Sequence, residues 1–188
     1  FMRFSIVITT HNRLSFLKRS INSALNQTVN CEVVVVDDDS SDGTEEYVKS
    51  LGDRVVYHRN YKNLGHSETV NQGIKIASGD WIKLLDDDDY LASECIEKLT
   101  NAIAFCPNAV LCSCQAIQVD VNEIEISRTK PSGIGEAFYL AQEDIHYGML
   151  LEMVPFGTPV QVAFKRDAFL NSGGWNTAFD GNCDDIDS

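Results

Sequence analysis

Short runs of apolar, mostly β-branched residues constrain the fold of this 188-residue chain more than any other feature. They occupy residues 4–9, 32–37, 55–58 and 81–85. Each run has the length of an ordinary strand and is too short for a typical helix. The run at 32–37 is apolar at every position between its acidic ends, which is expected of a central parallel strand buried on both faces.

Segments with helical spacing separate these four predicted strands. The pattern predicts helices at about 15–27, with Ser15 as the N-cap, and at about 42–51, 66–77 and 92–105. Strands and helices that alternate in this way predict an α/β fold with a doubly wound, mostly parallel sheet.

The second half of the chain departs from this alternation. Residues 109–119 and 122–129 predict two strands of a hairpin, and residues 135–153 predict a helix rich in polar and aromatic side chains. A further strand at 159–165 and a short helix at 166–171 are predicted after it. We therefore expect a small antiparallel portion beside the parallel sheet.

Three polar clusters follow directly after predicted strands. They lie at residues 10–13, 37–40 and 86–89. In open α/β sheets, ligands bind outside the carboxyl ends of the strands, so the three clusters should meet at one edge of the sheet. This convergence predicts the position of a binding site.

The charge of the chain narrows the choice of partners. It carries 28 acidic and 15 basic residues, a formal net charge of −13. This balance argues against nucleic acid, whose phosphates require clustered Lys and Arg. A polyphosphate ligand would need a cation between itself and such a surface.

No part of the sequence predicts a membrane span or a zinc site. No apolar run approaches the ~20 residues that a spanning helix requires. The six cysteines have no paired CxxC or Cys–His spacing of the kind that binds zinc. We expect a cytoplasmic protein, with any peripheral attachment to the inner face of the membrane made through parts outside this sequence.

Asp86–Asp89 is the sharpest single motif. Four consecutive carboxylates repel one another unless a cation or solvent compensates. An Asp-x-Asp pair can bind one divalent ion, Mn²⁺ or Mg²⁺, and leave coordination sites for diphosphate oxygens. The alternative is a purely structural first turn of the next helix, which Asp89 fits best. An EF-hand loop is excluded, because its sixth position requires Gly and is Leu91 here.

The cluster at 37–44 contains residues of two kinds, some that we expect to be structural and some that we expect to bind a ligand. Asp42 and Gly43 resemble a helix cap and a turn. Asp37 and Asp38 instead lie at the strand end, where a carboxylate can accept a hydrogen bond from a base imide such as N3 of uracil. Lys83, inside the last parallel strand, is expected to pair with the neighbouring carboxylates.

Taken in order, several of these motifs resemble the family 2 inverting glycosyltransferases of GT-A fold. The resemblance covers nearly the whole chain, and the agreement of several spaced motifs is more specific than any one of them. The segments that carry it are 4–13, 34–44, 63–65, 71–73 and 84–89.

The resemblance implies roles for several residues of the expected donor site. Thr9 and His11 would lie against the base, although His11 replaces the Tyr or Phe that is common there. Asp38 would bind a uracil-type base. Asp86 would contact the ribose side and support Asp88, the main metal ligand. The other expected donor contacts are Asn12, Arg13, Asp37, Gly65, His66 and Asp87.

The expected catalytic base comes from the end of the chain. Gly173–Asp185 resembles the family segment Gly-Gly-Phe-Asp followed by Glu-Asp, whose final Asp is the general base. That position is Asp185 here, and Asp184 replaces the Glu. Without the resemblance, residues 180–187 would be interpreted as a solvated acidic tail.

We therefore expect one catalytic domain over residues 1–188. About 3–107 would bind the nucleotide sugar, and about 108–188 would form an acceptor-side half that stops short of its full extent. The implied reaction is metal-assisted transfer of a sugar from a nucleoside diphosphate, UDP as first choice, to a carbohydrate or lipid-linked carbohydrate acceptor in cell-surface polysaccharide or glycan synthesis. A metal-dependent nucleotidyltransferase and a non-catalytic nucleotide-sugar-binding module remain alternatives.

Overall fold

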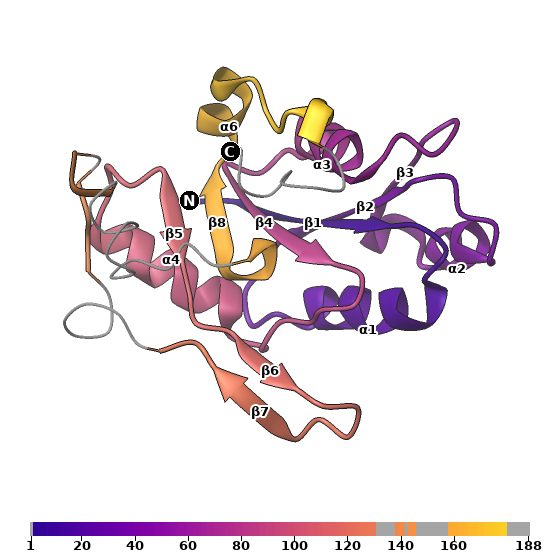
Figure 1. Ribbon diagram of the computed structural model, residues 1–188, viewed down its shortest axis with the longest axis horizontal. Helices are drawn as coiled ribbons and strands as arrows, with labels where there is room; N and C mark the ends of the chain where they lie inside the picture. Colours follow the sequence, from indigo (N-terminus) through magenta and orange to yellow (C-terminus); the bar gives the residue numbers. More distant parts are fainter. Residues whose placement is uncertain (1, 131–137, 142, 146–157, 180–188) are drawn as a thin grey trace.

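A computed structural model describes residues 2–130, 138–141, 143–145 and 158–179, and within these ranges a six-stranded sheet forms the centre of the fold (Figure 1). The strand order is β3-β2-β1-β4-β8-β5. The first four strands of this order are parallel, and β8 pairs antiparallel with both β4 and β5. The strands are β1 (Phe4–Thr10), β2 (Glu32–Asp37), β3 (Val56–Arg59), β4 (Trp81–Asp86), β5 (Leu111–Ser113) and β8 (Val162–Lys165).

Helices cover both faces of this sheet, so the predicted α/β architecture is confirmed (Figure 1). One core contains buried side chains of α1, α2 and α4, and the other contains those of α3 and α6. Alternate residues of the central strands serve the two cores: Ile6 and Ile8 of β1 belong to the first, and Val7 belongs to the second. The helices are α1 (Leu14–Leu25), α2 (Thr44–Ser50), α3 (His66–Ile76), α4 (Cys95–Phe105) and α6 (Arg166–Ser172).

The second half differs from the sequence prediction in its strand pairing. The expected single strand at 109–119 is two strands: β5 joins the main sheet, and β6 (Ile117–Val119) pairs with β7 (Glu125–Arg128) in a separate hairpin. The strand expected at 159–165 begins only at Val162, after a 3-10 turn at Pro159–Gln161. Most of the helix expected at 135–153 lies outside the described residues. None of the helices in the described ranges is long and apolar enough to cross a membrane.

The cap of the first helix differs from the prediction, whereas Asp42 contacts the first turn of the second helix as expected. Ser15 lies inside α1, whose N-cap is Arg13. The carboxylate of Asp42 instead accepts hydrogen bonds from the backbone N–H of Leu14, at 2.8 Å, and of Thr44, at 3.2 Å. One side chain therefore supplies an acceptor to the first turns of both α1 and α2, which a search for local caps does not anticipate.

Lys83 does not pair with the acidic run as the sequence predicted. Its side chain is fully buried, and its ammonium donates hydrogen bonds to the backbone carbonyls of Leu84, Pro159, Val160 and Val162. Burial lowers the pKa of this amine from its ordinary value. Lys83 thus fastens the turn before β8 to β4, next to the end of the sheet where Asp86 lies.

Gly73 allows α3 to approach the sheet closely. A Cβ at this position would lie 2.4 Å from Cγ1 of Val7 and 3.0 Å from Cγ2 of Val36. Any side chain would therefore push the helix away from β1 and β2. This contact explains the glycine of the 71–73 motif in structural terms.

We expect Gly73→Ala to lower the free energy of unfolding by about 1–3 kcal/mol, because overpacking outweighs the helix propensity of Ala. Denaturant titration measures the change. Val7→Ala removes the methyl that the new Cβ meets, so the double variant should lose less stability than the two single losses added together. Strict additivity would contradict the proposed contact.

Candidate active site

An open cleft of about 460 Å³ lies at the carboxyl ends of β1, β2 and β4. The register explains its position, because β1 pairs Thr10 with Asp37 of β2 and Thr9 with Asp86 of β4. The volume is within the range of small-molecule sites. The lining residues are Thr9, Thr10, His11, Arg13, Asp38, Asn63, Gly65, His66, Thr69, Asp86, Asp87 and Asp88.

The residues predicted as donor or metal contacts line this cleft, with two exceptions among those that the structure describes. The exceptions are Asn12 and Asp37. Asp184 and Asp185, the predicted catalytic carboxylates, lie outside the described residues. The arrangement brings the three polar clusters together, and the contacts with a donor remain predictions.

Arg13 and Thr10 hold the side chains of the acidic run. Asp87 is 5% exposed and accepts a 2.7 Å hydrogen bond from the hydroxyl of Thr10. The guanidinium of Arg13 lies 3.4 Å from Asp87 and 3.0 Å from the exposed Asp88. One cation therefore neutralises part of the charge of two neighbouring carboxylates.

Helix α1 holds the backbone of the same run. Arg19 donates a 2.9 Å hydrogen bond to the carbonyl of Asp88, and the Ser20 hydroxyl donates to the carbonyls of Asp86 and Asp89. The sequence analysis missed both residues. A signal for Ser20 was present, because this small polar residue lies on the apolar face of α1 beside Leu17 and Ile21, both fully buried.

Asp86 has the most perturbed carboxylate of the cleft. Burial, and to a lesser extent the neighbouring Asp89, Asp88 and Asp87, raise its pKa from the ordinary 3.8 to about 6, against the lowering effect of His66. The Nε2 atom of His66 lies 4.0 Å from Oδ1 of Asp86. A pKa near 6 means that this carboxyl is costly to ionise until a cation approaches it.

Asp38 organises the loop between β3 and α3. It is 5% exposed, and its two oxygens accept hydrogen bonds from the backbone N–H groups of Leu64 and Gly65 and from the side chain of Asn60. Gly65 has a φ of +87°, a conformation that favours glycine. Asp38 therefore shapes one wall of the cleft, in addition to any contact with a base.

Asp37 and Asn12, which do not line the cleft, have structural partners. Asp37 is fully buried and accepts hydrogen bonds from the Tyr57 hydroxyl at 2.7 Å and from the backbone of Ser40 at 2.8 Å. Asn12 accepts a hydrogen bond from the backbone of Ser41. His11 lies at the cleft itself, with its Nδ1 atom 2.6 Å from the carbonyl of Asp38.

Comparison with known proteins identifies the family. Residues 5–172 match the sequence model of glycosyl transferase family 2. The match covers all the elements that line the cleft.

The chain belongs to glycosyl transferase family 2.

A curated relative is similar to this chain over nearly its whole length. The chain is 30% identical over 183 residues to the glucosyl-dolichyl phosphate glucuronosyltransferase of Haloferax volcanii. This match covers 94% of the chain and 56% of the relative, so the chain spans little more than half the length of that protein.

Two solved structures share the fold of this family 2 chain. The S. aureus TarS complex with UDP has a TM-score of 0.72 and 21% identity, covering 98% of this chain and 53% of that one. A mannosyltransferase from Pyrobaculum calidifontis, in complex with GDP-Man and Mn²⁺, has a TM-score of 0.66 and 20% identity, covering 98% and 50%. At these identities the likeness shows the shared fold.

The carboxylate oxygens at the cleft fit a divalent cation that is also coordinated by a diphosphate. Within the described ranges, no group of three or more His, Cys, Asp or Glu side chains could hold a metal by itself. Asp86 and Asp88 nevertheless line one cleft as two nearby carboxylates. Mg²⁺ is commonly held by one or two carboxylates together with substrate phosphates and water, and this family 2 chain offers that partial set.

We expect Asp86→Asn to stabilise the metal-free protein above pH 6. A pKa raised in the folded state means that the stability from this group is present in acid and is lost as the pH rises through about 6. Asn resembles the protonated carboxyl, so the variant's unfolding temperature should exceed that of the wild type by a few degrees at pH 8, where about 1 kcal/mol corresponds to ~2–4 °C.

Thermal unfolding in a chelator at pH 8 and pH 4 measures this effect, and the difference should shrink at pH 4. Asp53→Asn, at an exposed position of the turn after α2, is the matched control and should show no such pH-dependent gain. A variant that is less stable than the wild type at pH 8 would contradict the assigned cost of ionising Asp86.

Proposed function

We propose that this family 2 chain transfers a sugar from a UDP-sugar to a hydroxyl of a carbohydrate or lipid-linked carbohydrate, with inversion at the anomeric carbon and a divalent cation. One observation carries the proposal. The strand ends that carry Thr9, Asp38 and Asp86–Asp88 meet at one cleft of about 460 Å³, large enough for a nucleotide.

The donor base belongs at the side of the cleft formed by His11, Asp38 and Gly65. Gly65 has no side chain to obstruct the approach of a nucleoside. The Asp38 carboxylate lies at the strand end and can accept the imide N–H of uracil beside its loop contacts. The TarS complex with UDP supports this choice of base, whereas the mannosyltransferase complex with GDP-Man makes GDP the alternative to test.

We place the diphosphate in the same cleft near Asp86, Asp88 and Arg13. Asp88 is the proposed main metal ligand, because it is exposed at the cleft, and Asp86 supports it. When bound, the cation would neutralise the charge of the diphosphate as it leaves. The Arg13 guanidinium neutralises part of the charge of Asp87 and Asp88, and it is near enough to the same space to bind a phosphate oxygen.

Asp185 is the proposed general base, with Asp184 beside it. As the acceptor oxygen attacks the anomeric carbon, the hydroxyl proton passes to the Asp185 carboxylate, and the bond from that carbon to the diphosphate oxygen breaks on the opposite face. A single displacement of this kind inverts the configuration and leaves UDP as the second product.

The acceptor class is inferred from the kind of reaction and from the relatives. The glucosyl-dolichyl phosphate glucuronosyltransferase has a lipid-linked sugar in its name. A carbohydrate or lipid-linked carbohydrate acceptor, in the synthesis of cell-surface polysaccharide or glycan, is consistent with this relationship. Attachment of the whole protein to the inner face of a membrane belongs to the same proposal.

We expect Asp185→Asn to lower kcat by about 10²–10⁴-fold, because the amide cannot accept the hydroxyl proton, while the Kd for UDP changes less than about twofold. Turnover of UDP-sugars with an added glycan acceptor, together with calorimetric titration of UDP, measures both quantities. Asp184→Asn tests the neighbouring carboxylate in the same way.

Asp187→Asn, two residues further along, is the matched control and should retain activity. An unchanged kcat in Asp185→Asn would remove the base assignment. UDP binding without turnover by the wild type would instead support a non-catalytic nucleotide-sugar-binding module.

A further inference from the structure

The side-chain amide of Asn71, in α3, forms hydrogen bonds with both the carbonyl and the N–H of the Trp175 backbone. The side-chain Nδ2 atom of Asn71 donates a 2.9 Å hydrogen bond to the carbonyl of Trp175, and Oδ1 accepts a 2.9 Å hydrogen bond from its backbone N–H. Asn71 is 7% exposed and Trp175 is 6% exposed. A buried, doubly hydrogen-bonded contact fixes the orientation of the segment more firmly than a single bond would.

Gly174 makes this contact possible. Its φ is +77°, and a Cβ at this position would lie 2.6 Å from Oδ1 of Asn71. The glycine therefore lets the chain turn closely over the amide. Residues 104 positions apart in the sequence are joined here, outside any helix or sheet pairing.

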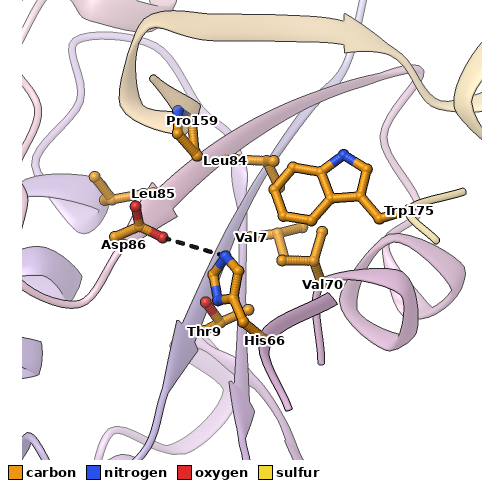
Figure 2. A pocket seen from close by; sticks show the side chains of 9 residues that line it. All are labelled: Val7, Thr9, His66, Val70, Leu84, Leu85, Asp86, Pro159 and Trp175. Atoms are coloured by element: carbon orange, nitrogen blue, oxygen red, sulfur yellow. Dashed lines mark ion pairs between the residues drawn. The ribbon is translucent and has the colours of Figure 1, made fainter. Parts of the chain in front are cut away.

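The contact places the Trp175 indole against His66, a residue that lines the cleft. Figure 2 shows the ring above Val70 and Val7, with His66 below Val7 in this view. The Trp175 and His66 rings lie 5.6 Å apart between centroids, and both line a small pocket together with Thr9 and Asp86. Thr9, His66 and Asp86 also line the large cleft, so the buried indole packs directly behind residues of the cleft wall.

We propose that Asn71 is a positioning residue for sugar transfer. Its amide fixes Trp175 against His66, which lines the cleft, and it anchors the chain at a point nine and ten residues before Asp184 and Asp185 in the sequence. The inference rests on the proposed function for its effect on turnover. The geometric part, that Asn71 holds the indole in place, stands independently.

This role predicts a separation between donor binding and turnover. Asp38 and Gly65, at the expected base side, make no hydrogen bond with Asn71 or Trp175 among the contacts described above. Loss of the Asn71 amide should therefore leave the hold on UDP nearly intact. The chemical step should suffer, since it depends on placing the sugar and the general base together.

We expect Asn71→Leu to lower kcat at least ~tenfold while the Kd for UDP stays within about twofold of the wild type. Leu has nearly the same size and cannot make either hydrogen bond. Gln72→Leu is the matched control, because Gln72 is the next residue of α3 and its amide donates a hydrogen bond to Glu68 of the same helix. The control should retain both kcat and Kd.

The emission of Trp175 reports on position without reference to turnover. Trp81 and Trp175 are the two tryptophans of the chain, so Trp81→Phe leaves Trp175 as the single emitter. In that background Asn71→Leu should shift the emission to longer wavelength as the indole gains water, and Gln72→Leu should not. If Asn71→Leu fails to fold, Gly174→Ala disturbs the same contact from the other side and should give the same shift and the same loss of kcat.

The outcomes distinguish the positioning of Trp175 by Asn71 from the effect of that positioning on turnover. Unchanged emission and kcat in Asn71→Leu would overturn it, as would equal losses of UDP affinity and kcat, which indicate a general structural defect. A wild type that turns over no UDP-sugar would refute the proposed function, while the emission shift would still show that Asn71 positions Trp175.

Discussion

The register between β1 and its two neighbours is the constraint on which the rest of the site depends. β1 pairs Thr10 with Asp37 and Thr9 with Asp86, so three parallel strands end at the same level. The polar segment that follows each strand must then turn into the same space, and the cleft forms there. A slip of one residue in either pairing would turn alternate side chains to the opposite face and bury the wrong set. The close packing of Gly73 against Val7 and Val36 holds α3 on these strands, and with it the wall that contains His66.

The concentration of negative charge at this edge is tolerated because neighbouring elements compensate it in two ways. Arg13 and Thr10 contact the carboxylates directly, whereas Arg19 and Ser20 hold the carbonyls of the same run. The negative charge of Asp86 is the least compensated of the run, and the raised pKa of this carboxyl reflects the free-energy cost of ionising it. A cation shared with a diphosphate would remove this cost, so binding of the proposed ligand should also stabilise the fold.

The sequence predicted those parts of the fold that depend on local patterns. The apolar β-branched runs predicted the parallel strands. Because ligands bind outside the carboxyl ends of such strands, the polar clusters that follow them were expected at one edge of the sheet. The division of residues 109–119 into β5 and β6 was not predictable, because it depends on pairing with β8 about fifty residues later. Nor did local spacing reveal that Lys83 binds backbone carbonyls or that Asn71 holds Trp175, since both contacts join distant segments. The predicted base, Asp185, lies outside the described residues, so its assignment depends on the family resemblance.

The central claim is that Asp88 holds a cation shared with the donor diphosphate, and calorimetric titration of UDP with Mn²⁺ or with a chelator tests it most directly. The account predicts that Mn²⁺ strengthens UDP binding by at least ~tenfold in the wild type, a gain of about 1.4 kcal/mol. Asp88→Asn should abolish this gain and leave metal-free binding unchanged, whereas Asp89→Asn, which does not line the cleft, should retain it. Equal UDP affinity with and without Mn²⁺ in the wild type, or a full Mn²⁺ effect in Asp88→Asn, would contradict the account.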